Sequence, residues 1–274
     1  MNFTEKLAGA VRRNKSLVCV GLDPDPELMP EKLSVSEFNK AIIDATTDLG
    51  CAYKPNLAFY EALGDEGMSA LKATVRHVPN HIPVIADAKR GDIGNTAKAY
   101  ARALFEYFGF DASTVNPYLG YDSVEPFLRY QEKGIFILCR TSNAGAVDFQ
   151  SLRCETESGV RPLFEIVARK AHEWNKYGNI GLVVGASYPE EFKLIRQSYP
   201  DMPLLIPGIG AQGCDLALTI LYGVDAQREK TIINSSRQII YASRGKDFAE
   251  AARKAALTLR DQINQHLSAL GERR

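Results

Sequence analysis

The segment Asp87-Ala-Lys89-Arg-Gly-Asp92 carries the side chains whose types and spacing best suit proton transfer and electrostatic catalysis. Asp87 and Lys89 stand two residues apart at the end of a β-rich run, so on an extended chain both side chains point to the same side. Lys54 ends the preceding β-rich run and would bring a second cation beside them. Charges gathered in a closed site perturb one another's pKa values and can stabilise charge that develops in a reaction.

A purely structural explanation of this segment is a salt bridge at a strand end, with Asp92 as the N-cap of the helix that follows. We favour a functional site, because a cluster of alternating charges in a closed site is costly to maintain. The predicted catalytic residues are therefore Lys54, Asp87, Lys89 and Asp92.

The segment Pro207-Gly-Ile-Gly-Ala-Gln-Gly213 matches the pattern G-x-G-x-x-G, which also occurs in dinucleotide-binding units. Such a unit would need an acidic residue at the end of the next strand, where this chain has Asn234-Ser-Ser-Arg237 instead. Backbone N–H groups of a glycine loop, joined by an arginine from the next strand, are typical of the phosphate site of (β/α)8 enzymes. The sequence therefore predicts a phosphate site, with a tight turn and a solvated arginine as the structural alternative.

Eight β-rich runs recur along the chain and must position these residues. They span 17–22, 52–55, 83–86, 112–116, 135–140, 181–185, 203–206 and 231–234. Most are continuous in apolar residues, as expected for parallel strands buried on both faces. Apolar residues with helical spacing lie between them over 38–49, 68–78 and 100–108, and Ser34 with Glu37 forms a capping-box pattern before the first. The alternation predicts the α/β class and a single (β/α)8 TIM barrel over residues 1–274, with a doubly wound sheet as the competing architecture.

Polar residues and one glycine end or follow most of these runs. They are Asp23, Lys54, Asp87, Lys89, Asn116, Arg140, Gly208 and Arg237. In a (β/α)8 barrel all of these positions crowd around the carboxyl-terminal face, where such enzymes have their active sites. The sequence therefore predicts one active site at that mouth of the barrel.

The overall composition argues against several classes of partner. The 33 basic and 33 acidic side chains give a formal net charge of zero, which is unlike a nucleic-acid-binding surface. No apolar run approaches the roughly 20 residues of a membrane helix, and the first residues lack the apolar stretch of a secretory signal. The five cysteines, several of them in apolar runs, indicate buried reduced thiols and a cytoplasmic location.

The sequence shows neither a cofactor motif nor a metal-ligand pattern. His77 and His81 are separated by Pro79, and together with His172 and His266 they form no metal-binding spacing. We therefore expect neither a cofactor nor a metal.

With Asp87-Ala-Lys-Arg-Gly-Asp-Ile-Gly-Asn-Thr96, the chain resembles the orotidine 5′-phosphate decarboxylase family, in particular its bacterial subgroup with D-A-K-R-G-D-I-x-x-T. Further matching segments are Val20-Gly-Leu-Asp-Pro24, Tyr53-Lys-Pro-Asn56, Val115-Asn-Pro-Tyr-Leu-Gly120, Pro207-Gly-Ile-Gly-Ala-Gln212 and Arg237. The resemblance implies a (β/α)8 homodimer with shared active sites. It also implies conversion of orotidine 5′-phosphate to UMP, the last step of de novo pyrimidine nucleotide synthesis, without metal or cofactor.

The resemblance implies a role for each matching residue. Lys89 would deliver a proton to C6 of the pyrimidine, and Asp87 would lie near the departing carboxylate between the two lysines. Lys54 and Asp23 would contact the ribose. Asp92 and Thr96 would act in the site of the partner subunit. The residues that would contact the phosphate and the pyrimidine are Gly208, Gly210, Gln212, Arg237 and Ser142, the last chosen over Thr141.

Two other functions are compatible with the same barrel. One is a Mg²⁺-dependent sugar-phosphate decarboxylase or aldolase of the same superfamily. Such an enzyme would require a metal, whereas an orotidine 5′-phosphate decarboxylase would not. The other is a non-catalytic nucleotide-binding barrel. The second lysine and aspartate argue against it, because a protein that only binds a nucleotide gains nothing from them.

Overall fold

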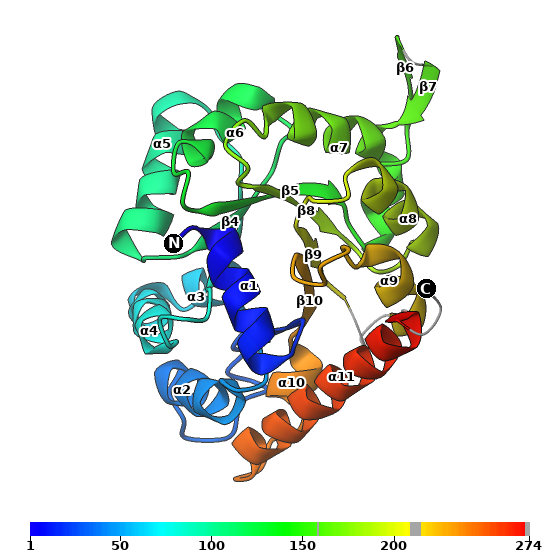
Figure 1. Cartoon of the computed structure of the whole chain (residues 1–274). Coiled ribbons are helices and arrows are strands. Elements are labelled where there is room, and N and C mark those ends of the chain that lie inside the picture. Colours follow the sequence, from blue (N-terminus) through cyan, green and yellow to red (C-terminus); the bar gives the residue numbers. More distant parts are fainter. Residues whose placement is uncertain (158, 209–214, 272–274) are drawn as a thin grey trace.

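The centre of the structure is an eight-stranded parallel sheet that curves into a nearly closed barrel with helices around it (Figure 1). The computed structural model describes residues 1–157, 159–208 and 215–271. The barrel strands are β1 (Val18–Leu22), β2 (Ala52–Pro55), β3 (Ile85–Arg90), β4 (Ala112–Val115), β5 (Gly134–Arg140), β8 (Ile180–Val184), β9 (Leu204–Ile206) and β10 (Thr231–Ser235). Apart from β2 and β3, each barrel strand pairs with the next one along the chain, and β1 pairs with β10. The predicted TIM barrel is therefore confirmed and the doubly wound sheet is wrong.

The two edges of this sheet, β2 and β3, meet through sparse contacts. Isolated bridges join Tyr53 to Val84 and Asn56 to Asp87, and the Tyr53 N–H donates to the carbonyl of Pro83 at 3.0 Å. These contacts bring the carboxyl ends of the second and third strands together. They therefore place Lys54 of β2 beside Asp87 of β3.

Helices connect the strands and cover the outside of the barrel (Figure 1). They are α1 (Phe3–Asn14), α2 (Val35–Thr46), α3 (Leu57–Glu61), α4 (Gly64–His77), α5 (Gly94–Arg102), α6 (Tyr121–Leu128), α7 (Leu163–Trp174), α8 (Pro189–Ser198), α9 (Leu216–Gly223), α10 (Arg237–Ile240) and α11 (Phe248–Gly271). A π-helical turn η1 (Ala103–Tyr107) continues α5, and a 3-10 turn η2 (Ala144–Asp148) follows β5. None of the described helices combines the length and apolarity needed to cross a membrane.

The sequence patterns explain why these segments fold as they do. The predicted capping box before α2 is confirmed, because the Glu37 N–H donates to Ser34 Oγ and the Ser34 N–H donates to the Glu37 carboxylate. Phe38 and Ile42 of the same helix are fully buried, and the Phe38 ring stacks on Phe248 of α11. All five residues of β1 are buried as well, as expected for a parallel strand covered on both faces.

Helix α1 lies across the amino-terminal end of the barrel (Figure 1). Lys6 pairs at 2.8 Å with Asp111, which precedes β4, and the Phe3 ring packs edge-on against Phe136 of β5. Gly134 at the start of β5 leaves the space that the Phe3 ring fills. With that end covered, the carboxyl-terminal end remains for a site.

A two-stranded hairpin that the sequence did not predict extends away from the barrel (Figure 1). It consists of β6 (Arg153–Thr156) and β7 (Gly159–Pro162), which pair antiparallel between β5 and α7.

The described cysteines are reduced, as predicted. They are Cys19, Cys51, Cys139 and Cys154. The first three are buried, and burial raises the pKa of the Cys19 thiol to about 12, so this thiol is inert at neutral pH.

Candidate active site

Lys54, Asp87 and Lys89 form one hydrogen-bonded charge cluster at the mouth of the barrel. Lys54 Nζ donates to Asp87 Oδ2 at 2.8 Å, and Lys89 Nζ donates to Asp87 Oδ1 at 2.6 Å. The Lys54 side chain is only 4% exposed, whereas that of Lys89 is 49% exposed. The cluster therefore has one ammonium fixed inside the barrel and a second one that faces the opening.

The electrostatics of the cluster keep its buried members charged. Burial alone would raise the pKa of the Asp87 carboxyl, but the Lys54 and Lys89 ammonium groups outweigh burial and hold that pKa well below its ordinary value. Burial alone would also lower the pKa of Lys54. The Asp87 and Asp23 carboxylates outweigh that effect and hold the pKa of Lys54 above its ordinary value. At neutral pH the site therefore contains a carboxylate between two cations.

A bulge in β3 aims the Lys89 side chain at Asp87. The expectation that both side chains point the same way is confirmed, but the reason given for it, an extended chain, is wrong. Lys89 has a φ of +47°, in the left-handed region that residues with side chains rarely occupy. The register between β3 and β4 shifts here, and its flanking pairs are Ala86–Ser113 and Arg90–Val115. A bulge next to an active site commonly redirects a side chain in this way.

Asp23 follows β1 and lies next to this cluster. Its Oδ1 is buried and has no hydrogen-bond partner within the described part of the chain, and its charge raises the pKa of Lys54. Two tyrosine hydroxyls hold the backbone around it. Tyr60 donates to the carbonyl of Leu22 at 3.0 Å, and Tyr241 donates to that of Asp23 at 2.9 Å. Asp23 thus presents a fixed carboxylate with free hydrogen-bonding capacity.

Asp92 and Thr96 make no hydrogen bond or ion pair with the cluster within the described residues. Within the described residues, Asp92 Oδ1 accepts a hydrogen bond from the Ile93 N–H at 2.8 Å, and Asp92 forms no ion pair with either lysine. The alternative of Asp92 as the N-cap of the next helix is wrong, because Ile93 is the N-cap of α5 and provides no side-chain cap. Thr96 is exposed in the first turn of α5.

The predicted phosphate site is described only in part. Gly210 and Gln212 lie outside the described residues. Gly208 follows β9 with a φ of +92°, a conformation that requires glycine. Arg237 is the first residue of α10, and its side chain is exposed and has no ion pair with any described residue. An exposed guanidinium at the end of β10 is free to bind an anion.

The two hydroxyl candidates after β5 differ in their hydrogen bonds. Thr141 Oγ1 donates to Asn143 at 2.6 Å and accepts from Gln150 at 2.9 Å, so its hydroxyl is already engaged. Ser142 makes no such side-chain bond within the described residues, and its backbone passes over Gly185 at the end of β8. A Cβ at Gly185 would lie 2.7 Å from the Ser142 nitrogen. Ser142 is therefore the hydroxyl with free bonding capacity.

Arg140 ends β5 as expected, but its side chain is buried and paired and so is not free for a ligand. Its side chain is 1% exposed and donates to Glu191 of α8 at 2.7 Å. The guanidinium also lies 3.9 Å from the centre of the Tyr188 ring. A buried charge with such partners ties β5 to α8 and is not available to a ligand.

Two residues that hold the site together were not predicted from the sequence, and the buried Arg140–Glu191 pair beside it was not predicted either. The two residues are Tyr241, which binds the Asp23 carbonyl, and Thr114 of β4, whose hydroxyl contacts both Asp87 and Lys89. The signal for Thr114 was a hydroxyl within the otherwise buried segment Ala-Ser-Thr-Val of β4. A buried hydroxyl next to a strand end needs a hydrogen-bond partner. Nothing local marks Tyr241 or the Arg140–Glu191 pair, because their partners are distant in the sequence.

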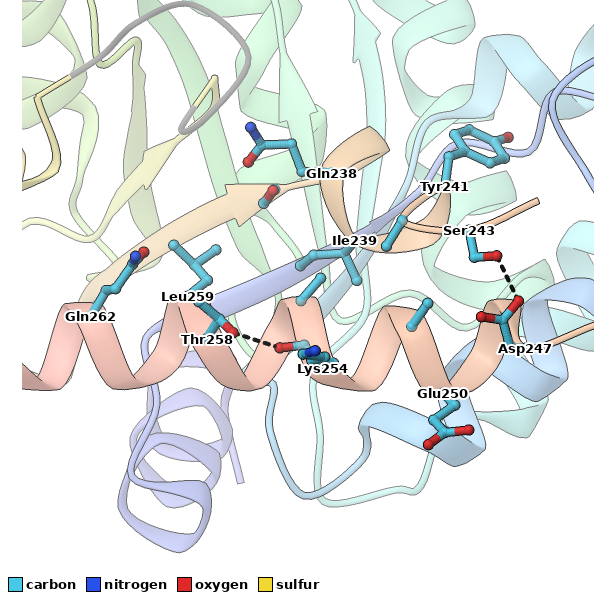
Figure 2. Close-up of a pocket in the computed structure, with 14 residues that line it drawn as sticks. Gln238, Ile239, Tyr241, Ser243, Asp247, Glu250, Lys254, Thr258, Leu259 and Gln262 are labelled. Carbon is cyan, nitrogen blue, oxygen red and sulfur yellow. Dashed lines mark hydrogen bonds between the residues drawn. The ribbon is translucent and has the colours of Figure 1, made fainter. Parts of the chain in front are cut away.

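A cavity of about 1000 Å³ lies elsewhere, between α10 and α11 (Figure 2). Residues that line it include Gln238, Asp247, Lys254 and Gln262. Lys54, Asp87 and Lys89 do not line this cavity, although Tyr241, whose hydroxyl binds the Asp23 carbonyl, does.

Histidines and carboxylates do not assemble a metal centre in the part of the chain that the structure describes. His77 ends α4 and pairs with Asp44 of α2 at 2.6 Å, which is a contact between two helices.

The chain is similar to known proteins in sequence and in fold. The model of the orotidine 5′-phosphate decarboxylase / HUMPS family matches residues 16–255. The orotidine 5′-phosphate decarboxylase of Dehalococcoides mccartyi (strain CBDB1) is 58% identical over 266 residues, which cover 97% of this chain and 98% of that protein. The enzyme of Herpetosiphon aurantiacus is 52% identical, with 93% and 95% covered. Among solved structures, the Leishmania donovani OMP decarboxylase has a TM-score of 0.84 and 40% identity, with 97% and 98% covered.

Proposed function

The chain belongs to the orotidine 5′-phosphate decarboxylase / HUMPS family and is a decarboxylase, and from this premise we propose that it converts orotidine 5′-phosphate to UMP. The observation that carries the proposal is the Lys54–Asp87–Lys89 cluster at the mouth of the barrel. The reaction would be the last step of de novo pyrimidine nucleotide synthesis. We also propose that residues 1–274 form a single catalytic domain, and that buried reduced thiols suit a cytoplasmic location.

In the proposed mechanism, the bond between C6 and the carboxylate carbon breaks and its electron pair stays on C6. Carbon dioxide leaves, and the Lys89 ammonium, the more exposed of the two, gives a proton to C6. Lys89 is then a neutral amine and regains a proton from solvent after product release. The fixed ammonium groups stabilise the negative charge on C6 without having to reorganise.

Asp87 contributes through its charge and its position. Its carboxylate lies between the two ammonium groups, and we propose that the carboxylate of the substrate is placed beside it. The repulsion between the two carboxylates is relieved when carbon dioxide leaves, while the attraction of the lysines for charge at C6 persists. This difference in electrostatic energy favours the transition state over the bound substrate.

We propose a reaction without metal or cofactor, and the donor set of Asp87 supports this choice. Both of its carboxylate oxygens already accept hydrogen bonds from ammonium groups. A Mg²⁺ ion at this carboxylate would displace those donors and lie beside two cations, which is electrostatically unfavourable. The arrangement therefore suits the metal-free decarboxylase better than its Mg²⁺-dependent relatives.

The remaining contacts are assigned to the rest of the substrate. Asp23 and Lys54 would bind the ribose, because the free Asp23 Oδ1 lies next to the cluster. Ser142 would contact the pyrimidine, because the Thr141 hydroxyl is engaged elsewhere. The 5′-phosphate would be bound by Gly208, Gly210, Gln212 and Arg237.

We propose a homodimer in which Asp92 and Thr96 complete the site of the partner subunit. Within the described residues, Asp92 forms no ion pair with Lys54 or Lys89 of its own chain. Large apolar side chains are exposed after β3 and after β4, the two strands that pair side by side. They are Ile93, Tyr118, Leu119 and Tyr121, the last at the start of α6. We propose that they contribute to the interface of the dimer, since exposed apolar side chains mark interaction surfaces.

The function is tested by measuring UMP formation from orotidine 5′-phosphate with the purified chain, before and after exhaustive EDTA treatment. We expect the same rate in both. No UMP formation would contradict the decarboxylase function, and a loss of activity that Mg²⁺ restores would favour the metal-dependent relatives.

The shared site is tested by mixing two inactive variants, Lys89→Ala and Asp92→Ala, under conditions in which subunits exchange. Random pairing makes half of the dimers mixed, and each mixed dimer has one intact site. Activity should therefore recover to roughly a quarter of that of the wild type. If Asp92 serves its own chain, demonstrated subunit exchange will restore nothing.

A further inference from the structure

The bulge in β3 leaves one residue of β4 facing three residues of β3. Between the flanking register pairs, residues 87–89 lie opposite the single residue Thr114. Regular sheet hydrogen bonds are interrupted at a bulge, so the Lys89 N–H needs another acceptor. The positive φ of Lys89 adds to this requirement, because such a conformation persists only where surrounding contacts impose it.

The Thr114 side chain provides that acceptor. Its Oγ1 accepts a hydrogen bond from the Lys89 N–H at 2.9 Å and donates to Asp87 Oδ1 at 3.2 Å. The same Asp87 oxygen accepts the Lys89 ammonium at 2.6 Å. One buried hydroxyl, 1% exposed as a residue, thus closes a ring of hydrogen bonds through the backbone and the side chain of Lys89.

We propose that Thr114 is a positioning residue for decarboxylation, whose hydroxyl holds Lys89 in its left-handed conformation and orients the Asp87 carboxylate. Thr114 acts through these two residues and need not touch the substrate. This role rests on the function proposed above, in which the Lys89 ammonium must lie within reach of C6. A displaced proton donor slows the chemical step, because proton transfer requires hydrogen-bond distance.

The side chain must be a hydroxyl for this purpose. Valine has nearly the same shape as threonine but would leave the Lys89 N–H and one site on Asp87 without a partner. Serine keeps the hydroxyl and loses only a methyl group. The neighbouring Ser113 offers a matched control. Its buried hydroxyl donates to the backbone carbonyl of Thr114 and, within the described residues, forms no hydrogen bond with Asp87 or Lys89.

The test compares Thr114→Val, Thr114→Ser and Ser113→Ala by steady-state kinetics with orotidine 5′-phosphate and by calorimetric titration with UMP. Thr114→Val should lower kcat on the order of 10- to 100-fold, the cost of a misplaced catalytic group. Its affinity for UMP should change by less than about threefold, because the phosphate and ribose contacts come from other strands. Thr114→Ser should recover most of kcat, and Ser113→Ala should stay near the wild type.

A crystal structure of Thr114→Val separates this proposal from the proposed function. We expect Lys89 to leave the left-handed region and its Nζ to move from Asp87. An unchanged Lys89 in that structure would overturn the positioning role even if the wild type showed no decarboxylase activity. Wild-type kcat in Thr114→Val, or a kcat of Thr114→Ser as low as that of Thr114→Val, would also overturn it.

Thr114→Cys keeps the test decisive if Thr114→Val does not fold. The thiol is a weaker donor and acceptor than the hydroxyl, so kcat of Thr114→Cys should fall below that of Thr114→Ser. A Thr114→Cys enzyme as fast as the wild type would contradict the proposal.

Discussion

Replacing Asp87 by asparagine should destabilise the fold as well as abolish the proposed reaction. The change keeps the shape of the side chain but removes the charge that faces the Lys54 and Lys89 ammonium groups. Lys54 is 4% exposed and cannot recover its hydration in the folded state. The variant therefore retains a buried cation without its main partner.

The expected magnitude follows from the exposure of the two lysines. Leaving a buried ion without its partner costs about 3–5 kcal/mol, and Asp23 near Lys54 favours the lower end of that range. Lys89 is half-exposed, so water replaces Asp87 there at a cost of no more than about 1 kcal/mol. For 274 residues the entropy of unfolding is about 0.6 kcal/mol per degree. The melting temperature should thus fall by roughly 5–9 °C.

The pH dependence has a defined sign. Asp87 has a lowered pKa, so its contribution to stability is lost only as the pH falls below its ordinary value. Lys54 has a raised pKa, so its contribution is lost only as the pH rises above its ordinary value. The wild-type pair should therefore contribute constantly between about pH 5 and 9. In Asp87→Asn, burial lowers the pKa of Lys54 with less opposition, so the deficit should shrink as the pH rises.

Calorimetry and urea unfolding between pH 6 and 9 measure these effects. Two controls isolate the cause. Lys89→Met removes the exposed partner and should stay within about 1 kcal/mol of the wild type. The double variant Lys54→Met/Asp87→Asn removes the buried charge together with its partner and should regain most of the lost stability. The reasoning is refuted if Asp87→Asn melts at the wild-type temperature, or if the double variant is no more stable than Asp87→Asn.

Two further predictions concern groups at the ends of β1 and β10. Arg237→Ala should lower kcat/KM roughly 10- to 150-fold, because it removes a charge-assisted contact to the 5′-phosphate. This corresponds to a loss of about 1.5–3 kcal/mol of transition-state stabilisation. In calorimetric titrations the variant should bind UMP more weakly than the wild type but should bind uridine, which lacks the phosphate, equally well. An equal loss of affinity for UMP and uridine would contradict the assignment of Arg237 to the phosphate. Tyr241→Phe removes the hydroxyl that donates to the Asp23 carbonyl and accepts from the Asp25 N–H. Tyr241→Phe should lower the free energy of unfolding by about 1–3 kcal/mol and raise KM. Wild-type values in urea unfolding and in steady-state kinetics would show that the Tyr241 hydroxyl is not needed to hold the backbone around Asp23.

The strand pattern was sufficient to predict the barrel and the meeting of Lys54 with Asp87 and Lys89. Parallel strands buried on both faces carry a strong apolar signal, and the barrel brings their carboxyl ends together. The predicted third run stopped at residue 86, because Asp87 and the residues after it break the apolar pattern, whereas β3 continues to Arg90. The fold places those polar residues on the strand because the mouth of the barrel accommodates them.

Features that depend on contacts distant in the sequence could not be predicted. The bulge opposite Thr114 is a property of the register between two strands, which propensity does not specify. The position of Arg140 at the end of β5 does not reveal that its side chain is buried and paired, because its partner Glu191 lies 51 residues later. Tyr241 likewise lies 218 residues from Asp23, whose carbonyl it binds.

The sparse junction between β2 and β3 has a consequence for the motions of the protein. Local opening of a fold begins where few backbone hydrogen bonds must break, and this junction has only isolated bridges within the described residues. Lys54 and Asp87 bridge the same junction, so each opening event separates the buried ion pair. Amide hydrogen exchange at Tyr53 should therefore be faster than at Ile137, whose strand β5 pairs regularly with both β4 and β8 at this position. A ligand that contacts both Lys54 and Asp87 would slow that exchange, coupling occupancy of the site to closure of the barrel wall.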